Sequence, residues 1–126
     1  MDKMDKQTLE EFYKQLKSFL KEIISVFPQD NSLKVISTSL SLATKEQNNK
    51  LVVSFWNAFY PLNDMILSRD EDFFRVEPSL YYKNKYQLEL FEKMKVYYFL
   101  LSDNNKTVVW DYIQNIYTIC KDLNAK

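Results

Sequence analysis

Apolar side chains recur at steps of three and four residues along most of this chain, the spacing that places them on one face of an α-helix. The first such stripe lies between residues 9 and 27 and consists of Leu9, Phe12, Leu16, Phe19, Ile23 and Phe27. Before it, Thr8 and Glu11 have the spacing of a capping box. Pro28 ends the pattern, because a residue that precedes proline is disfavoured in the α region. We therefore expect a helix from Thr8 to Phe27, with residues 1–7 frayed.

Three shorter helices are expected in the middle of the chain. Asn31 or Ser32 could cap the first of them, and a polar turn over Lys45–Asn49 follows it. The next helix stops before Pro61, and its apolar positions are Leu51, Val52, Phe55, Trp56 and Phe59. A short helix over Leu62–Ile66 comes directly after this proline, which is well placed near a helix start.

The last third of the chain predicts two more helices after an irregular acidic stretch over residues 68–78. One has apolar positions between residues 86 and 101, and the turn Ser102–Asn105 follows it. The final stripe is the clearest of all and consists of Val109, Ile113, Ile116, Cys120 and Leu123. Few segments alternate with the period of two that a strand requires. The pattern as a whole predicts an all-α fold, a compact bundle of about five to six helices in a single domain over residues 1–126.

Composition agrees with this fold class, because the chain contains no glycine. Hairpins of a β-sheet need turns with positive φ, which glycine usually supplies. Asparagine also tolerates this geometry, and its pairs, Asn48-Asn49 and Asn104-Asn105, lie where helices are expected to end. At 126 residues the chain has the length of one domain and needs no disulfide or metal to fold.

The absence of glycine and histidine excludes many kinds of active site. Loops that cradle phosphates and dinucleotides need glycine, and Ser-His and Cys-His nucleophile pairs need an imidazole. One thiol cannot build a zinc site of the Cys/His type. We therefore expect no enzyme, no cofactor, no metal and no catalytic residues. A metal-dependent enzyme centred on Asp70, Glu71 and Asp72 is the surviving alternative, and a solvated acidic loop explains the same residues.

Charge and targeting features indicate a cytoplasmic protein. The formal net charge is zero, and no apolar run approaches the roughly 18 residues that a membrane span requires. The N-terminal residues are charged and lack the apolar region of a signal peptide. Cys120 is the only cysteine, so no intrachain disulfide can form, which fits a reducing compartment.

A segment rich in lysine and tyrosine offers one candidate binding surface. Between residues 78 and 98 four lysines face only two glutamates, and several tyrosines lie among them. Aromatic rings beside basic side chains can stack on bases while the charges neutralise phosphates. The candidate nucleic-acid-binding residues are Lys83, Lys85, Lys93, Lys95, Tyr97 and Tyr98. The alternative is a helix whose aromatic residues face the core and whose lysines face water.

A second candidate surface consists of aromatic residues that no helical stripe includes. Phe73, Phe74, Tyr81 and Tyr82 lie between the acidic residues 64–77 and the basic residues 78–98. Interfaces are enriched in exposed aromatic residues, so these four are candidate partner-binding residues. The acidic and basic segments either neutralise each other within the fold or form a complementary surface for self-association or a partner.

Three stretches together carry a resemblance to a group of viral proteins. They are Phe19–Pro28, Tyr60–Leu67 and Lys106–Gln114. A first helix that ends in Phe-Pro and a last helix with Trp-x-Tyr-Ile-Gln resemble small helical proteins of nucleocytoplasmic large DNA viruses. The resemblance implies a protein of viral replication or assembly, in the host cytoplasm or the virion, without known catalytic residues. It adds Trp110 and Gln114 to the candidate partner-binding residues, although Trp110 could instead serve packing while Gln114 lies at the surface.

The leading hypothesis is therefore a non-enzymatic helical protein that acts through a protein–protein surface. Binding of nucleic acid through the lysine- and tyrosine-rich segment is the alternative.

Overall fold

The protein is helical throughout the part of the chain that its computed structural model describes, residues 6–45 and 49–124. Within these ranges it forms six α-helices and four short 3-10 helices, without a strand. In chain order these are α1 (Lys6–Val26), α2 (Asn31–Lys45), α3 (Asn49–Phe59), η1 (Tyr60–Leu62), α4 (Asn63–Ser68), η2 (Glu71–Phe74), η3 (Pro78–Leu80), α5 (Lys85–Tyr97), η4 (Tyr98–Leu100) and α6 (Asp103–Asn124). The predicted all-α bundle is confirmed.

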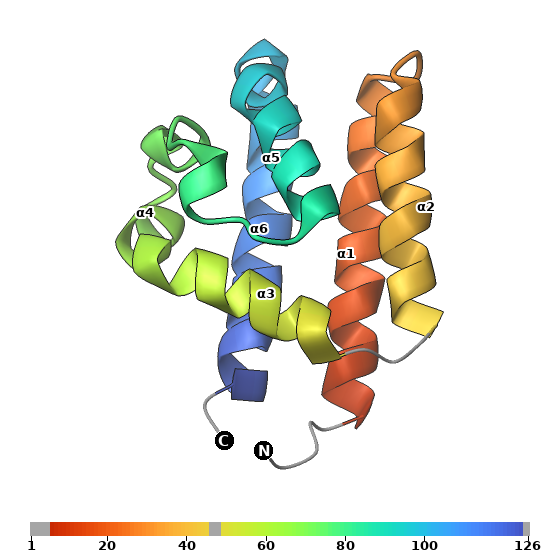
Figure 1. The fold of residues 1–126 in the computed structure, drawn as a ribbon. Coiled ribbons are helices and arrows are strands. Elements are labelled where there is room, and N and C mark those ends of the chain that lie inside the picture. Colours follow the sequence, from red (N-terminus) through yellow and green to blue (C-terminus); the bar gives the residue numbers. More distant parts are fainter. Residues whose placement is uncertain (1–5, 46–48, 125–126) are drawn as a thin grey trace.

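The long helices α1 and α6 form the centre of the bundle. α1 packs against both α2 and α6, and α2 also contacts α5. α3 crosses the front of the molecule at a steep angle to these helices and packs against α6 (Figure 1). One face of α3 is therefore part of the core, while the opposite face looks outward.

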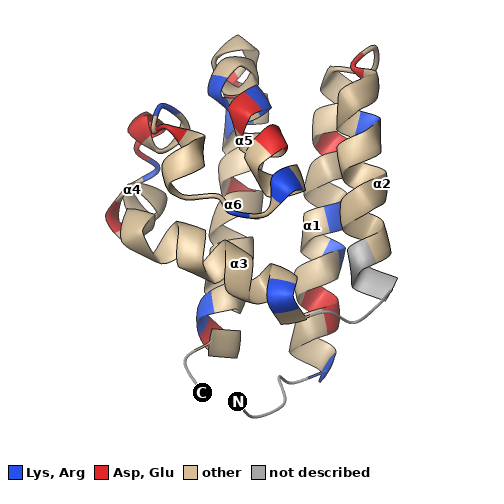
Figure 2. Ribbon diagram, viewed as in Figure 1, with Lys and Arg blue, Asp and Glu red and all other residues tan. Residues whose placement is uncertain are grey.

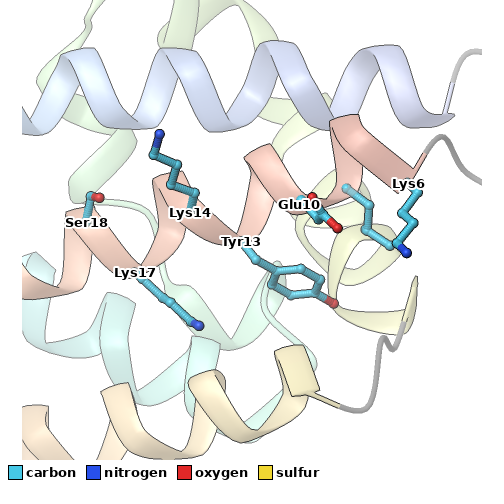
Figure 3. A pocket seen from close by; sticks show the side chains of 7 residues that line it. Lys6, Glu10, Tyr13, Lys14, Lys17 and Ser18 are labelled. Atoms are coloured by element: carbon cyan, nitrogen blue, oxygen red, sulfur yellow. The ribbon is translucent and has the colours of Figure 1, made fainter.

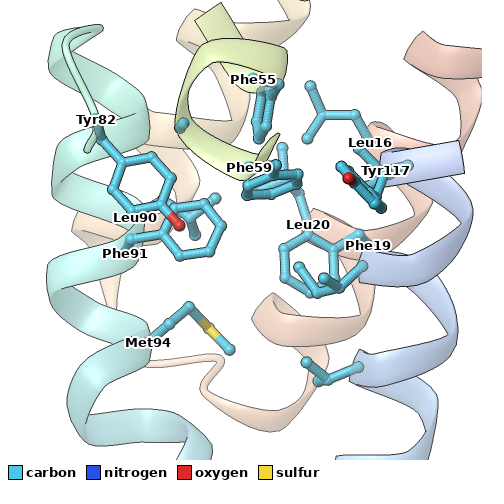
Figure 4. Packing of buried hydrophobic residues seen from close by; sticks show 14 of the residues in the cluster. Leu16, Phe19, Leu20, Phe55, Phe59, Tyr82, Leu90, Phe91, Met94 and Tyr117 are labelled. Atoms are coloured by element: carbon cyan, nitrogen blue, oxygen red, sulfur yellow. The ribbon is translucent and has the colours of Figure 1, made fainter. Parts of the chain in front are cut away.

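Aromatic rings fill the space where α3, α5 and α6 meet (Figure 4). Phe59 is fully buried, and five rings lie around it at centroid distances between 5.4 and 6.4 Å, from Phe55, Phe73, Tyr82, Phe91 and Tyr117. All five pairs are edge-to-face, the arrangement in which the positive ring edge meets the negative ring face. The many aromatic side chains of the sequence therefore lie largely inside the molecule.

The helices end before the prolines as predicted, but the starts of α1 and α2 differ from the prediction. α1 ends at Val26 before Pro28 and α3 ends at Phe59 before Pro61, as expected. α1 already begins at Lys6, so the predicted start at Thr8 is wrong, as is the fraying of residues 6 and 7; residues 1–5 lie outside the described residues. Neither Asn31 nor Ser32 caps α2, because the carboxylate of Asp30 accepts the hydrogen bond from Leu33 N at 3.2 Å.

The two predicted turns are shorter than expected. Asp103, Asn104 and Asn105 already belong to α6, since the hydroxyl of Ser102 accepts a hydrogen bond from Asn105 N at 3.2 Å and caps the helix. Lys45 is the last residue of α2 and Asn49 the first residue of α3. The rest of that polar turn lies outside the described residues.

Left-handed backbone geometry falls on an arginine rather than on an asparagine. Arg69 follows α4 with φ 54°, the only positive φ in the described part of the chain. Its guanidinium donates to Gln114 Oε1 at 2.8 Å and to Asp111 Oδ1 at 2.7 Å, so its side chain is anchored on α6. Gln114 Nε2 in turn donates to the carbonyl oxygen of Ile66 at 3.0 Å. This bond gives a partner to one of the last carbonyl groups of α4, which have no partner within the helix. These bonds offset the cost of a non-glycine residue in this region, about 1–2 kcal/mol.

Candidate functional site

The predicted aromatic surface is wrong for most of its residues. Phe73, Phe74, Tyr82 and Trp110 are at most 3% exposed. η2 and the segment before α5 turn the first three rings into the core, and Trp110 lies on the buried face of α6. Phe73 lies 5.6 Å from Trp110, ring centre to ring centre. Tyr81 alone of the four aromatic candidates from residues 73–82 stays half-buried at the surface.

Gln114, a predicted partner-binding residue, has a structural role in the folded chain. Its side chain is half-buried and joins Arg69 to the end of α4, as described above. Trp110 Nε1 donates a hydrogen bond to the hydroxyl of Tyr98 at 2.9 Å inside the core. Trp110 is therefore not available to a partner, and the amide of Gln114 is engaged by groups of its own chain.

The lysine- and tyrosine-rich segment does not assemble into one surface. Lys93 and Lys95 form ion pairs with Asp30 (2.8 Å) and Glu77 (3.6 Å). Tyr97 donates a hydrogen bond to Asp30 and stacks on Phe27. Tyr98, buried in the core, cannot stack on a base, so its predicted role is wrong.

Two of the predicted lysines have exposed side chains and form no ion pair among the described residues. Lys85 Nζ lies 5.6 Å from the ring centre of Tyr86. Lys83 Nζ lies 3.4 Å from the carbonyl oxygen of Ser79. Only this pair of the six predicted residues therefore presents positive charge near the start of α5 without an ion pair in the described part of the chain.

The acidic residues 64–77 serve mainly as local partners. Glu77 meets Lys95, Glu71 lies 3.4 Å from Lys106, and Asp72 lies 2.9 Å from Arg75. The carboxylate of Asp70 caps η2 by accepting a hydrogen bond from the Asp72 backbone at 2.9 Å. The acidic and basic segments are thus joined directly by one ion pair, that of Glu77 and Lys95. Among the described residues, no three cysteine or carboxylate side chains gather as ligands for a metal ion.

The outward face of α3 carries an aromatic stack that the sequence pattern did not single out. Tyr60, which is 55% exposed, stacks on Trp56 with ring centres 5.6 Å apart and planes inclined by 27°. Trp56, half-buried, stacks in turn on the buried ring of Tyr117 at 5.9 Å and 14°. The core ring therefore holds the two outer rings in a defined orientation. The apolar stripe of α3 includes Trp56, and Tyr60 lies at the helix boundary, so the helical pattern does not indicate an exposed stack. The sequence feature that does indicate it is a Trp–Tyr pair four residues apart, the spacing of neighbours on one helix face.

A groove of about 350 Å³ lies beside this stack, between α3 and the segment that leads to α5. Its lining is mostly apolar and consists of Asn49, Lys50, Val53, Ser54, Asn57, Tyr81 and Lys83. Trp56 and Asn57 lie three and four residues after Val53, and Tyr60, the first residue of η1, lies three residues after Asn57. Residues at this spacing share one helix face, so the groove and the stack lie on the same side of α3. We call the groove together with Trp56 and Tyr60 the α3 surface.

The wall of the groove contains a buried polar pair. Ser54 Oγ donates a hydrogen bond to Gln87 Oε1 at 2.8 Å, and Gln87 is fully buried on α5. Gln87 Nε2 has no hydrogen-bond partner among the described residues. The pair ties α3 to α5 directly behind the groove and fixes the distance between its two sides.

Two other hollows are less suited to a binding role. The first, about 440 Å³, is lined by Leu9, Tyr13, Ser18, Glu10 and the side chains of three lysines, all of which belong to α1 (Figure 3). Burial raises the pKa of Tyr13 from 10 to about 12, so its hydroxyl is even less readily ionised than that of an exposed tyrosine. The second hollow lies beside the Asp30 cluster at the turn between α1 and α2. The described lining of each comes mainly from one continuous stretch of chain, whereas the α3 surface joins two segments.

No helix in the described ranges combines the length and apolarity needed to cross a membrane. Neither a protein-family model, nor a curated protein, nor a solved structure matches this chain.

Proposed function

We propose that this chain is a non-enzymatic helical protein that binds a protein partner through the α3 surface. The observation that carries the proposal is the exposed stack of Tyr60 on Trp56 beside a mostly apolar groove. Tryptophan and tyrosine dominate the energetics of protein interfaces, because they bury a large rigid area at low entropic cost. The absence of glycine and histidine, which removes most catalytic arrangements, supports the non-enzymatic part.

The exposed part of Tyr60 is large enough to matter for affinity. An aromatic side chain buries on the order of 200 Å² when fully covered, so a partner would cover roughly 100 Å² on this ring. At about 25 cal/mol per Å² this contributes about 2.5 kcal/mol, or about 60-fold in affinity. Because Tyr117 already orders the stack, little side-chain conformational entropy is lost when a partner immobilises the rings.

The test is capture of partners with the protein as bait, in wild-type form and as Tyr60→Ser. The matched control is Leu100→Ser, because Leu100 is 67% exposed and lies in η4, outside the α3 surface. We expect Tyr60→Ser to lose the captured protein while Leu100→Ser keeps it, with both variants melting close to wild type. Equal capture by all three proteins, or no captured protein at all, contradicts the proposal.

The cellular setting is a separate part of the proposal. The resemblance of the first and last helices to proteins of large DNA viruses supports a role in viral replication or virion assembly in the host cytoplasm. The single cysteine, which is buried, is compatible with a reducing compartment. An antibody against the protein tests this: detection in purified virions or cytoplasmic viral factories is expected, and detection only outside them rejects this setting.

A further inference from the structure

We propose that the α3 surface binds an acidic segment of a partner protein, with an apolar side chain in the groove and carboxylates beside it. The inference rests on the proposed function and specifies the chemistry of the partner.

The charge of the groove is the first argument. Two lysines, Lys50 and Lys83, are among its described lining residues, and none of these described residues is an aspartate or glutamate. Figure 2 shows Lys and Arg colouring at the start of α3 and immediately before and at the start of α5. The described lining therefore carries two basic side chains on a chain whose net charge is zero. Carboxylates of a partner complement that charge, and complementary charge selects partners and speeds association.

The state of Lys83 is the second argument. Three other lysines of this half of the molecule, Lys93, Lys95 and Lys106, each meet a carboxylate of the same chain. In the described part of the chain Lys83 has no such carboxylate, and its ammonium lies near the Ser79 carbonyl instead. A partner carboxylate can thus approach Lys83 without displacing an internal ion pair.

The shape and polarity of the groove indicate a protein segment. Val53 and the ring of Tyr81 provide apolar contact, and the amides of Asn49 and Asn57 and the hydroxyl of Ser54 provide hydrogen-bonding groups. A volume of about 350 Å³ lies at the lower end of the range for small-molecule pockets. An open hollow of this size, next to the exposed ring of Tyr60, suits one apolar anchor of a longer chain that continues over the stack.

Nucleic acid fits the same surface less well. Two exposed lysines in the lining are few for a ligand that carries a charge on every nucleotide, since phosphate contacts supply most non-specific affinity. Tyr97 and Tyr98, the tyrosines expected to stack on bases, are occupied by Phe27 and by the core. Binding of nucleic acid is therefore kept as an outcome that overturns the proposal.

The experiment is a selection of random 16-residue peptides displayed on phage against the full-length protein. We expect the enriched peptides to carry Asp or Glu on one or both sides of an aromatic or aliphatic residue. Synthetic copies should bind about tenfold more weakly to Lys83→Glu than to wild type, since attraction becomes repulsion, and more weakly as salt rises. The matched control is Lys34→Glu on α2, an exposed lysine that does not line the groove, which should bind as wild type does.

The outcomes show whether the acidic partner alone, or partner binding at the α3 surface as well, is overturned. Enrichment of neutral or basic peptides that Tyr60→Ser fails to bind overturns the acidic partner and leaves partner binding at the α3 surface standing. Acidic peptides that bind Tyr60→Ser and Lys83→Glu as they bind wild type overturn both. Absence of any enriched peptide, or displacement of the peptides by an oligonucleotide of single-stranded DNA or RNA, also overturns the inference. Thermal melting of Lys83→Glu close to wild type shows that a loss of binding is not a loss of fold.

Discussion

The cluster of Asp30, Lys93 and Tyr97 should make the stability of the bundle depend on pH. Asp30 caps α2 and is held by two side chains of α5, more than 60 residues away in the chain. Its side chain is 13% exposed and that of Lys93 26%. The hydrogen bonds from Lys93 and Tyr97 lower the pKa of Asp30 from 3.8 to about 2. One residue thus joins the second helix to the fifth.

The magnitude follows from linkage. A difference of one pKa unit between the folded and unfolded states is worth about 1.4 kcal/mol, so this shift corresponds to about 2.5 kcal/mol as an upper bound. Because one side of the cluster faces an open hollow, screening by solvent reduces this to about 1–2 kcal/mol. The pKa is lowered in the folded state, so the contribution is fully present above the unfolded value of 3.8. It is lost as the pH falls towards about 2.

The perturbation is Asp30→Asn, which keeps a capping side chain but removes the charge. Urea unfolding at several pH values between 7 and 2 gives the free energy of unfolding of both proteins. We expect Asp30→Asn to be less stable by about 1–2 kcal/mol at pH 7 and the difference to shrink towards pH 2. The control is Asp122→Asn, at an exposed position of α6, which should leave the free energy of unfolding within about 0.5 kcal/mol of wild type. A difference for Asp30→Asn that stays constant over this pH range refutes the reasoning.

Three further predictions concern the core and the end of α4. Phe73→Ala should lower the free energy of unfolding by about 3–5 kcal/mol, as for a buried ring; a loss below about 1 kcal/mol in urea unfolding contradicts its burial. Gln114→Ala should cost about 1–3 kcal/mol, because the Ile66 carbonyl and Arg69 lose their partner; an unchanged melting temperature argues against this link. Cys120 should react with a thiol reagent only on unfolding, since burial raises the pKa of its thiol, and fast labelling of the native protein contradicts this.

The helices themselves were largely predictable from local features. Stripes of apolar residues repeated over three or more turns located α1, α3 and α6, and the prolines at positions 28 and 61 marked where helices stop. The caps were less predictable, because aspartate, asparagine and serine all cap helices and one of each stands at the start of α2, at positions 30, 31 and 32. The structure selects Asp30, whose carboxylate also meets Lys93 on α5.

The candidate surface was not predictable from the pattern of the chain. Residues 70–82 contain 3-10 helices of three and four residues, too short for any period to show which rings face inward. Phe73, Phe74 and Tyr82 were therefore expected outside, and the structure buries them. Trp56 was expected inside, and the structure leaves it half-buried beneath Tyr60.

The class of the fold and the absence of glycine- and histidine-based motifs can both be read from the sequence. Both follow from local properties, the spacing of apolar residues and the presence or absence of residue types. Only the tertiary structure decided which lysines meet carboxylates and which aromatic rings face solvent. Those outcomes depend on contacts such as that of Ser54 with Gln87, between helices far apart in the chain. No local spacing specifies them, because they follow from how α3 crosses the bundle and how α5 packs against α2.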